Sequence, residues 1–444
     1  MKTLRIGAGA GYSGDRIDPA VELAAKGSIR YLVFECLAER TIALAQKAKR
    51  IDPATGYDPL LEERMESVLP LCVRNGIRII SNMGAANPVA AAEKTREVAQ
   101  RLGLKGLRIA AVTGDDVLPA VRDGGFQFIE NGCDVGTLGE KIISANAYLG
   151  VSPILEALDA GADVILTGRV ADPALFLAPM IHEFGWSTDN WNLLGQGTVI
   201  GHLLECAGQL TGGYFSDPGF KDVPGLAHIG FPIAEISEDG SAVLTKVEGS
   251  GGMITRATCT EQLLYEIQDP AAYLTPDVIA DFSQVSITEI GRDRVEITGG
   301  RGRTRPSTLK VSVGYLDGYV GEAQISYAGP GAYARAQVAR EVLLERLKNI
   351  PFNELRCDFI GVNAILGNLL SRINCEPLEV RLRTIGRADS VRLASMIPRE
   401  VEALYTNGPA GGGGVAGSTG ETIAILSTFV VRSMVRHRIN YEVS

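Results

Sequence analysis

The sequence has few of the residues on which several protein classes depend. Its 444 residues include seven cysteines, four histidines and two tryptophans. The cysteines are odd in number, widely scattered and without a C-x-x-C pair. This pattern favours reduced thiols and argues against a disulfide framework or a structural zinc site. We therefore expect no metal site built from histidine or cysteine.

Long apolar runs and long basic runs are also missing. No apolar stretch approaches the roughly 20 residues that span a bilayer, and no signal-peptide core follows Lys2. Forty-three Lys and Arg against 52 Asp and Glu leave a net charge of −9. No basic run is long enough to follow a nucleic-acid backbone. We expect a cytoplasmic protein that binds neither membranes nor nucleic acid.

Glycine, in contrast, is abundant. The 52 glycines make up about 12% of the chain, against a usual ~7%. They show no collagen-like period and cluster in short segments, which predicts many tight turns. With 45% hydrophobic and 21% charged residues, the chain is suited to large buried cores and is unlike a disordered protein.

The first half of the chain alternates short apolar runs with helical patterns, which is typical of a parallel sheet covered by helices. The expected strands are 4–7, 30–35, 77–81, 107–113, 126–130 and 163–167. The expected helices are 19–26, 37–49, 60–75, 88–102, 153–160, 173–183 and 197–210. We predict a parallel α/β domain over residues 1–212.

From about Tyr214 the pattern changes to short strands and turns. The expected elements are strands 234–237, 242–247, 285–290, 294–297, 309–315, 359–364 and 378–384, helices 258–267 and 334–348, and a glycine loop over 408–420. Asp239-Gly240 and Asp317-Gly318 are hairpin signals. The last 24 residues fit strand or helix. We predict a strand-rich domain over 213–330 and an α+β segment over 331–444, which either stands alone or joins 213–330.

Polar residues follow five strands of the predicted parallel sheet. In chain order they are Asp15 and Arg16, then Glu35, then Asn82 and Asn87, then Asp115 and Asp116, then Arg169 and Asp172. Ligands of parallel α/β sheets bind beyond the carboxyl ends of the strands. This set of residues is therefore the best sequence evidence for a site.

The first of these loops permits two interpretations. Residues Gly9–Gly14 match G-x-G-x-x-G, and Glu35 ends the next strand 21 residues after Gly14, which is the outline of a dinucleotide-binding fingerprint. However, residues 15–18 separate the third glycine from the following helix, and Asp15 places a negative charge beside the expected diphosphate. The alternative is a tight turn, with Asp18 capping the helix.

Two other strand ends carry charged groups with open roles. Arg169 presents a fork suited to a carboxylate, a phosphate or a thioester substrate, while Asp172 is suited to catalysis or to capping a helix. Asp115 and Asp116 could bind Mg²⁺, carry a raised pKa for acid–base chemistry, or cap a helix. We favour a site that requires no cofactor and keep Mg²⁺ as the alternative.

The remaining candidates lie on a helix and in two glycine loops. His202 and Glu205 are three residues apart, so one face of a helix presents both, either as an acid–base pair or as a buried structural pair. Lys246, Gly251 and Gly252 could bind an anion ahead of a helix. Gly411 and Gly412 belong to a second candidate cradle that lacks the Lys-Ser/Thr ending of a P-loop.

Many ordered segments of the sequence together resemble the acyclic terpene utilisation (AtuA-type) family. They include 14–16, 37–41, 82–88, 114–116, 167–172, 183–186, 201–206, 211–213, 231–235, 239–240, 251–252, 261–266 and 276–278, as well as Lys246. The chain differs from the commoner family pattern at residues 34–36, where Glu35 is the acid. The resemblance implies breakdown of branched acyclic acids, such as geranyl-type acids handled as coenzyme A thioesters. It also implies a separate small subunit of about 100 residues.

From these residues we expect a catabolic enzyme that adds or removes water on a branched carboxylic acid or its acyl-CoA thioester. Its expected catalytic residues are Glu35, Asp115, Asp116, His202 and Glu205. Its expected binding residues are Asp15, Arg16, Asn82, Asn87, Arg169, Asp172, Lys246, Gly251, Gly252, Gly411 and Gly412. The chain is expected to form a homo-oligomer. The alternatives are a nicotinamide-dependent oxidoreductase and a non-catalytic subunit of an acyl-CoA enzyme complex.

Overall fold

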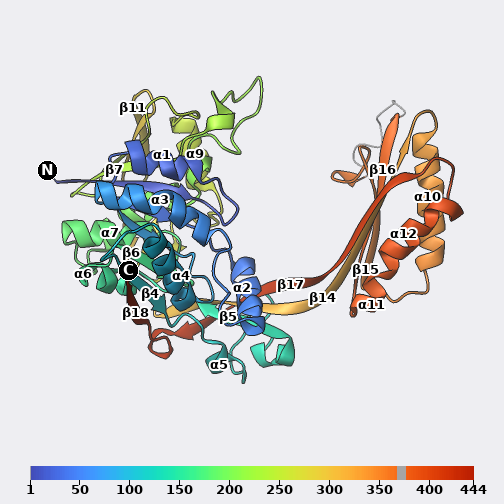
Figure 1. Cartoon of the computed structure of the whole chain (residues 1–444), viewed down its shortest axis with the longest axis horizontal. Coiled ribbons are helices and arrows are strands. Elements are labelled where there is room, and N and C mark those ends of the chain that lie inside the picture. The colour runs from blue at the N-terminus through green and yellow to red at the C-terminus, as the bar shows by residue number, and fades with distance from the viewer. Residues whose placement is uncertain (1, 368–376) are drawn as a thin grey trace. The chain divides into compact units, whose positions relative to one another are not determined.

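The computed structural model describes residues 2–367 and 377–444, so that Cys375 lies outside the described residues. The chain forms two compact units (Figure 1). The first contains the chain up to Gly314 and from Ile425 onward, and the second contains Tyr315–Ala424. The mixed α/β class expected from the sequence is confirmed, while the expected boundaries after residues 212 and 330 do not coincide with these units.

The first unit is built on a sheet of ten strands in the order β11-β12-β8-β7-β1-β2-β3-β6-β4-β18. Its five central strands are parallel and match five of the six strands expected in the first half. They are β1 (Thr3–Ala10), β2 (Tyr31–Phe34), β3 (Arg78–Ser81), β6 (Val164–Thr167) and β4 (Arg108–Thr113). Because they are parallel, their carboxyl ends meet at one edge of the sheet.

Antiparallel strands extend the sheet on both sides. They are β7 (Pro232–Ser237), β8 (Ala242–Lys246), β12 (Arg294–Thr298) and β11 (Ser286–Gly291) beyond β1, and β18 (Arg438–Val443) beyond β4. The hairpin expected at Asp239-Gly240 joins β7 to β8. Since β7 pairs with β1 along Thr3–Gly7, much of the segment 213–330 completes the sheet of the first unit.

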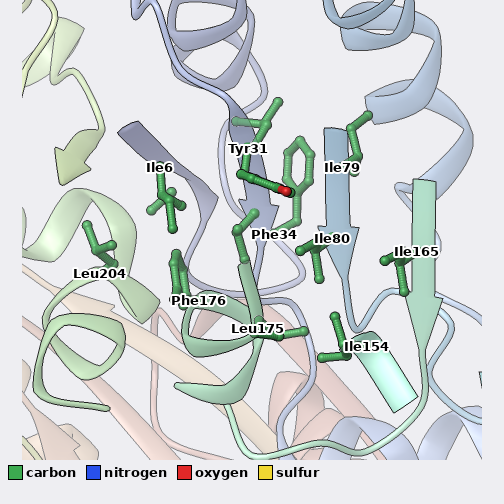
Figure 2. Packing of buried hydrophobic residues seen from close by; sticks show 14 of the residues in the cluster. Ile6, Tyr31, Phe34, Ile79, Ile80, Ile154, Ile165, Leu175, Phe176 and Leu204 are labelled. Carbon is green, nitrogen blue, oxygen red and sulfur yellow. The ribbon is translucent and has the colours of Figure 1, made fainter. Parts of the chain in front are cut away.

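Helices cover both faces of the central sheet. As a result, every residue of β2 and β6 is buried, whichever face its side chain is on. One group packs together as α1 (Asp18–Lys26), α3 (Leu61–Asn75) and α4 (Pro88–Arg101), and another as α6 (Ser152–Asp159), α7 (Ala174–Phe184) and α8 (Trp191–Glu205). The other helices of this unit are α2 (Glu39–Ile51), α5 (Leu118–Val121) and α9 (Arg256–Leu264). Figure 2 shows the core, where Phe176 and Leu204 lie near strand residue Ile6. Each such aliphatic or aromatic side chain contributes about 1.5–3 kcal/mol when fully buried.

The second unit follows a β-α-β-β-α-β order with strands arranged β15-β16-β14-β17, as in ferredoxin-like folds. Its elements are the later part of β14 (Thr308–Ala328), α10 (Ala332–Leu347), β15 (Glu354–Ile360), β16 (Glu379–Ala388), α11 (Val391–Ala394), α12 (Met396–Asn407) and the earlier part of β17 (Gly413–Val431). It has its own core, which includes Ile325, Leu343 and Leu382.

Four local expectations are corrected by the structure. Asp317-Gly318 is not a hairpin, because β14 continues through it. Gly318 instead has a φ of +101° and lies close to Ala388 of β16. Most of the expected loop 408–420 is strand β17, residues 126–130 form no strand, and α8 begins at Trp191. The sequence pattern also missed β5 (Ile142–Ala147), which pairs with β14. Apolar residues of β5, β14 and β17 form a small separate core.

Candidate active site

A cavity of about 900 Å³ opens at the carboxyl ends of β1, β2 and β6. Of the site residues expected from the sequence, Glu35, Arg169, Asp172 and Glu205 line it. Its volume is typical of a pocket for a small molecule. A more open hollow of about 990 Å³ beside α9 contains none of the expected site residues. The cavity at the strand ends is therefore the candidate active site.

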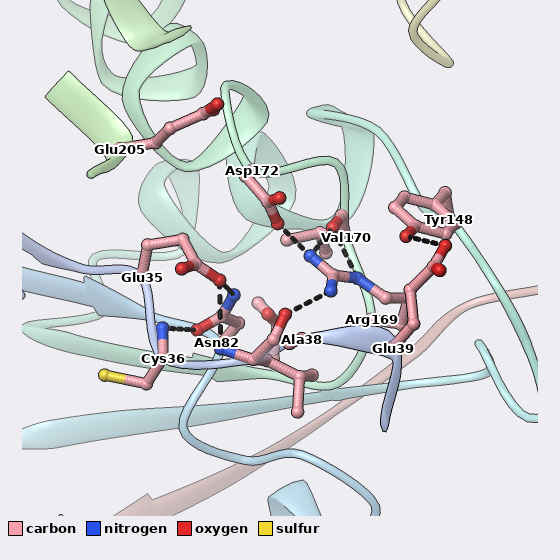
Figure 3. Close-up of polar contacts among 12 residues, drawn as sticks. Glu35, Cys36, Ala38, Glu39, Asn82, Tyr148, Arg169, Val170, Asp172 and Glu205 are labelled. Atoms are coloured by element: carbon pink, nitrogen blue, oxygen red, sulfur yellow. Dashed lines mark hydrogen bonds and ion pairs between the residues drawn. The ribbon is translucent and has the colours of Figure 1, made fainter. Parts of the chain in front are cut away.

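Glu35 directly follows β2, and its carboxylate is almost completely buried. Its Oε1 accepts hydrogen bonds from the Leu37 amide at 2.9 Å and from Asn82 Nδ2 at 2.8 Å (Figure 3). Burial raises the pKa of Glu35 to about 7, although Arg169 and these hydrogen bonds lower it. The carboxyl group can therefore exchange a proton near neutral pH.

Asn82, expected to bind substrate, holds Glu35 in place instead. It is fully buried after β3, and its Oδ1 accepts a hydrogen bond from the Cys36 amide at 2.7 Å. Its amide nitrogen is the group that donates to Glu35. Both ends of the side chain are thus used to fix the turn after β2.

Arg169 follows β6 and is 1% exposed. Its guanidinium donates to the backbone carbonyls of Leu37 and Val170 and forms an ion pair with Asp172 (Figure 3). It also lies over the Tyr148 ring, 4.6 Å from the centroid. Most of its donors are therefore engaged within the protein, and its charge acts on the cavity mainly through the electrostatic field.

Asp115 supports the Arg169 loop from outside the cavity. Its Oδ2 accepts hydrogen bonds from the Arg169 amide at 2.9 Å and from Asn146 Nδ2 at 2.8 Å. Burial raises the pKa of Asp115 to about 6, against the effect of these bonds. Asp116 points elsewhere and accepts hydrogen bonds from the Leu118 amide and from Gln46. The two carboxylates therefore have separate structural partners.

His202 and Glu205 form the pair expected on one face of a helix. His202 Nδ1 lies 2.9 Å from Glu205 Oε1, and both side chains are buried. His202 Nε2 lies 3.0 Å from the backbone oxygen of Gln262 in α9. Burial raises the pKa of Glu205, and the positive charge of His202 opposes this effect. Only Glu205 of the pair lines the cavity.

The other side of the cavity carries residues that the sequence did not single out. Glu39 Oε1 accepts hydrogen bonds from Tyr148 Oη at 2.7 Å, Lys310 Nζ at 2.9 Å and Ser312 Oγ at 2.8 Å. Burial alone would raise the pKa of Glu39, but these three donors together lower it. Exposed Arg40 also lines this wall, and it forms no ion pair within the described residues.

The glycine loop after β1 is organised around a buried arginine of α3. Arg64 is fully buried and donates to the backbone oxygens of Ser13 at 2.8 Å and Asp15 at 3.1 Å, and it forms an ion pair with Asp58. A Cβ at Gly11 would lie 2.5 Å from the backbone of Cys206. The glycine and the loop carbonyls are therefore used in internal packing, which gives no geometric support to the dinucleotide interpretation.

Other expected residues near the strand ends also have partners within the protein. Asp15 accepts hydrogen bonds from the amides of Gly11 and Arg16, and Arg16 forms an ion pair with Asp18. Asn87 caps α4 and donates to the backbone oxygens of residues 53 and 55. None of the three expected binding residues lines the cavity.

The two expected anion cradles are not part of the cavity either. Lys246 Nζ donates to the Ser250 carbonyl at 2.7 Å and lies 3.6 Å from Asp293. The amides of Gly251 and Gly252 donate to backbone oxygens of residues 228 and 224. Gly411 and Gly412 belong to the second unit, where a Cβ at Gly412 would meet Ile325. These groups thus either have hydrogen-bond partners within the protein or are packed against neighbouring side chains.

Comparison with known proteins identifies the family of the chain. The family model for "Acyclic terpene utilisation family protein AtuA" matches residues 4–441. The chain belongs to this family. No curated protein and no solved structure matches it.

Membership in the AtuA family assigns the chain a catabolic role in acyclic terpene utilisation. The match covers both structural units and confirms the family resemblance seen in the sequence. In the described ranges, no helix has the length and apolar character needed to cross a bilayer. The same residues contain no group of three or more His, Cys, Asp or Glu side chains placed to hold a metal ion.

Several residues in or beside this cavity were not predicted. Tyr148, which lines it, follows β5, a strand that the sequence pattern missed. Arg64 lies inside α3 and holds the loop that contributes Ser13 to the wall. Tyr273 and Phe429 come from distant segments that meet the cavity only in the folded chain. An arginine in an otherwise apolar helix stripe is the one signal that could have indicated Arg64, because buried arginines require partners.

Proposed function

We propose that this AtuA-family protein is a lyase that adds water to, or removes it from, a branched carboxylic acid or its acyl-CoA thioester. The observation that carries the proposal is Glu35, a buried carboxyl group in the cavity wall with a pKa raised to about 7. A carboxyl group of this kind can give or take a proton at neutral pH.

The cavity offers apolar surface for a branched chain. The large aliphatic and phenylalanine side chains among its lining residues are Leu37, Leu274, Leu309, Ile425 and Phe429. Pockets lined by aliphatic and aromatic groups, with a few polar groups at one end, are typical for small amphipathic ligands. A branched acyl group against these side chains would present its polar end to the charged part of the wall.

Arg40 is the best candidate for holding an anionic group of the ligand. It lies in the first turn of α2, at the positive end of the helix dipole. Lys310 lies on the same wall, but it is paired with Glu39. This assignment replaces Arg169, whose guanidinium is occupied by Leu37, Val170 and Asp172.

Two proton-carrying groups allow a balanced addition of water across an α,β-double bond. The water oxygen bonds to the β carbon while Glu205 Oε2, the carboxyl oxygen that does not contact His202, takes one of its protons. The electron pair of the double bond forms a C–H bond at the α carbon with the proton of neutral Glu35. Dehydration is the reverse. Each turnover moves one proton from Glu35 to Glu205, and solvent returns it.

The test is isotope incorporation by the purified full chain. A geranyl-type α,β-unsaturated thioester and its free acid are each incubated with the protein in oxygen-18 water, and the products are analysed by mass spectrometry. We expect incorporation of labelled oxygen, reduced ~100-fold or more in Glu35→Gln. Asp116→Asn, which lies outside the cavity, is the matched control. No incorporation by the wild type from either compound would overturn the proposal.

A further inference from the structure

The hydrogen bonds of His202 determine where its protons are. Nε2 lies 3.0 Å from the backbone oxygen of Gln262, and Nδ1 lies 2.9 Å from Glu205 Oε1. A carbonyl oxygen only accepts hydrogen bonds, so Nε2 carries a hydrogen. The second hydrogen bond then needs one proton, which is held either by Nδ1 of an imidazolium or by Oε1 of a neutral carboxyl group.

The same geometry fixes the role of the other carboxyl oxygen of Glu205. If the proton were on Oε2, two lone pairs would face each other between Nδ1 and Oε1 at 2.9 Å. Oε2 is therefore without a proton in both forms of the resting pair, before it takes a proton from water. It is a hydrogen-bond acceptor whatever the state of His202.

This acceptor lacks a partner within the described chain. Glu205 Oε2 has no hydrogen bond there and is itself screened from solvent, while the Glu205 residue as a whole is 7% exposed and belongs to the cavity wall. A buried acceptor without a donor is unfavourable, because it has lost its hydrogen bonds to water and has formed none within the protein. A donor group on a ligand in the cavity would satisfy it once a small displacement of the Glu205 carboxylate brings Oε2 to the cavity.

The proposed function supplies the donor, because the hydroxyl group of a hydroxy acid is the polar group at the reacting carbon. The positive charge of Arg169 also acts on this part of the cavity, where it lowers the pKa of both Glu35 and Glu205. A hydroxyl group supplies one donor for the one free acceptor.

We propose that Glu205 Oε2 accepts a hydrogen bond from a hydroxyl group of the ligand, so that the cavity selects a branched hydroxy acid, free or as its thioester, over the deoxy compound. The inference rests on the proposed function for placing the ligand in this cavity. The hydroxyl is the group that dehydration would remove and hydration would create.

The test is calorimetric titration of the full chain with two acids that differ only in a β-hydroxyl group. We expect the wild type to bind the hydroxy acid about tenfold more tightly. In Glu205→Gln the preference should persist, because the amide NH₂ donates to Nδ1 and its oxygen still faces the ligand. In Glu205→Leu the two acids should bind about equally.

Equal affinities in the wild type would overturn the inference, and this measurement does not depend on whether the leucine variant folds. Loss of the preference in Glu205→Gln, or its full retention in Glu205→Leu, would overturn it as well. Oxygen-18 incorporation is measured on the same samples. A hydroxyl preference without incorporation contradicts only the proposed function, and incorporation without a preference contradicts only this inference.

Discussion

Glu35 and Glu205 line the same cavity from the end of β2 and from α8, and the pKa of Glu35 is raised first by burial and then by the negative charge of Glu205. The two residues are 170 positions apart in the sequence. Each carboxyl group has its own support, Asn82 for Glu35 and His202 for Glu205. Acid–base chemistry on one ligand requires two neighbouring groups of which one holds a proton while the other is free to accept one.

The rate should depend on pH in the same way in both directions of the reaction. Hydration needs neutral Glu35 and unprotonated Glu205, and dehydration needs the same total number of protons on the two groups, because turnover only moves one proton between them. The hydration equilibrium releases no proton, so the ratio of kcat/KM in the two directions cannot change with pH. We expect kcat/KM in both directions to fall as pH rises through about 7, where Glu35 ionises. The measurement is kcat/KM against pH with the unsaturated and the hydroxylated compounds. A constant kcat/KM through this range would contradict the role of Glu35.

The stability of the first unit should also reflect Glu35. Its pKa in the folded protein is about 7, above the ordinary value of 4.5. The stability that it contributes is therefore fully present below pH 4.5 and is lost as pH rises through about 7. The difference in unfolding free energy between wild type and Glu35→Gln, measured by urea titration, should change across this window. For Asp115→Asn the window is 3.8 to about 6. If these differences in unfolding free energy did not change with pH, the raised pKa values of Glu35 and Asp115 would both be contradicted.

Arg40→Gln should weaken binding of an anionic ligand by about tenfold without affecting stability. Arg40 is exposed and lines the cavity without an ion pair among the described residues. Its effect should decrease at high salt, since exposed charges are screened. Calorimetry of a branched acid measures the change. Arg16→Gln, which removes an arginine outside the cavity, is the control, and equal losses in both variants would argue against a specific role.

Arg64→Met should destabilise the first unit by about 3–5 kcal/mol, because it leaves the buried Asp58 carboxylate without its cationic partner. It also removes the donor to the carbonyls of Ser13 and Asp15. Urea unfolding measures the loss. Adding Asp58→Leu should recover part of it, because an uncompensated buried charge is then removed. If Arg64→Met alone were as stable as the wild type, this would contradict the organising role of Arg64.

Gly11→Ala should cost about 1–3 kcal/mol of stability, since its Cβ would lie 2.5 Å from the Cys206 backbone, which cannot move away easily. Gly14→Ala is the matched control within the same motif. Its Cβ would meet only the Tyr12 ring, which is 61% exposed and can rotate. Its effect should stay below about 1 kcal/mol. Equal costs in thermal or urea unfolding would argue against packing as the reason for Gly11.

The positions of the central strands and the gathering of their carboxyl ends could be predicted from the sequence. Alternating apolar runs and helical patterns indicate a parallel sheet, and strand ends of such a sheet meet whatever their order. This reasoning brought Glu35, Arg169 and Asp172 to one cavity. The spacing of His202 and Glu205 similarly predicted their contact, because three residues span about one helical turn.

Spacing could not predict which polar side chains would already be satisfied. In the sequence, Lys246 and Asp115 resemble residues of a binding site. In the structure, Lys246 donates a hydrogen bond to the Ser250 carbonyl, and Asp115 accepts one from the Arg169 amide. Asp317-Gly318 resembles a hairpin, yet it lies inside β14, directly before Tyr319, where the pairing of β14 with β16 begins. These outcomes depend on residues far away in the chain.

The sequence by itself determined the family, the α/β class and the edge of the sheet at which polar residues collect, since these follow from local periodicity and from many ordered motifs. Only the tertiary structure decided that the glycine loop surrounds Arg64, that Glu35 has a pKa near neutrality, and that Glu205 keeps one acceptor for a ligand. Burial and hydrogen-bond partners set these properties, and both are decided by which distant segments meet in the folded chain.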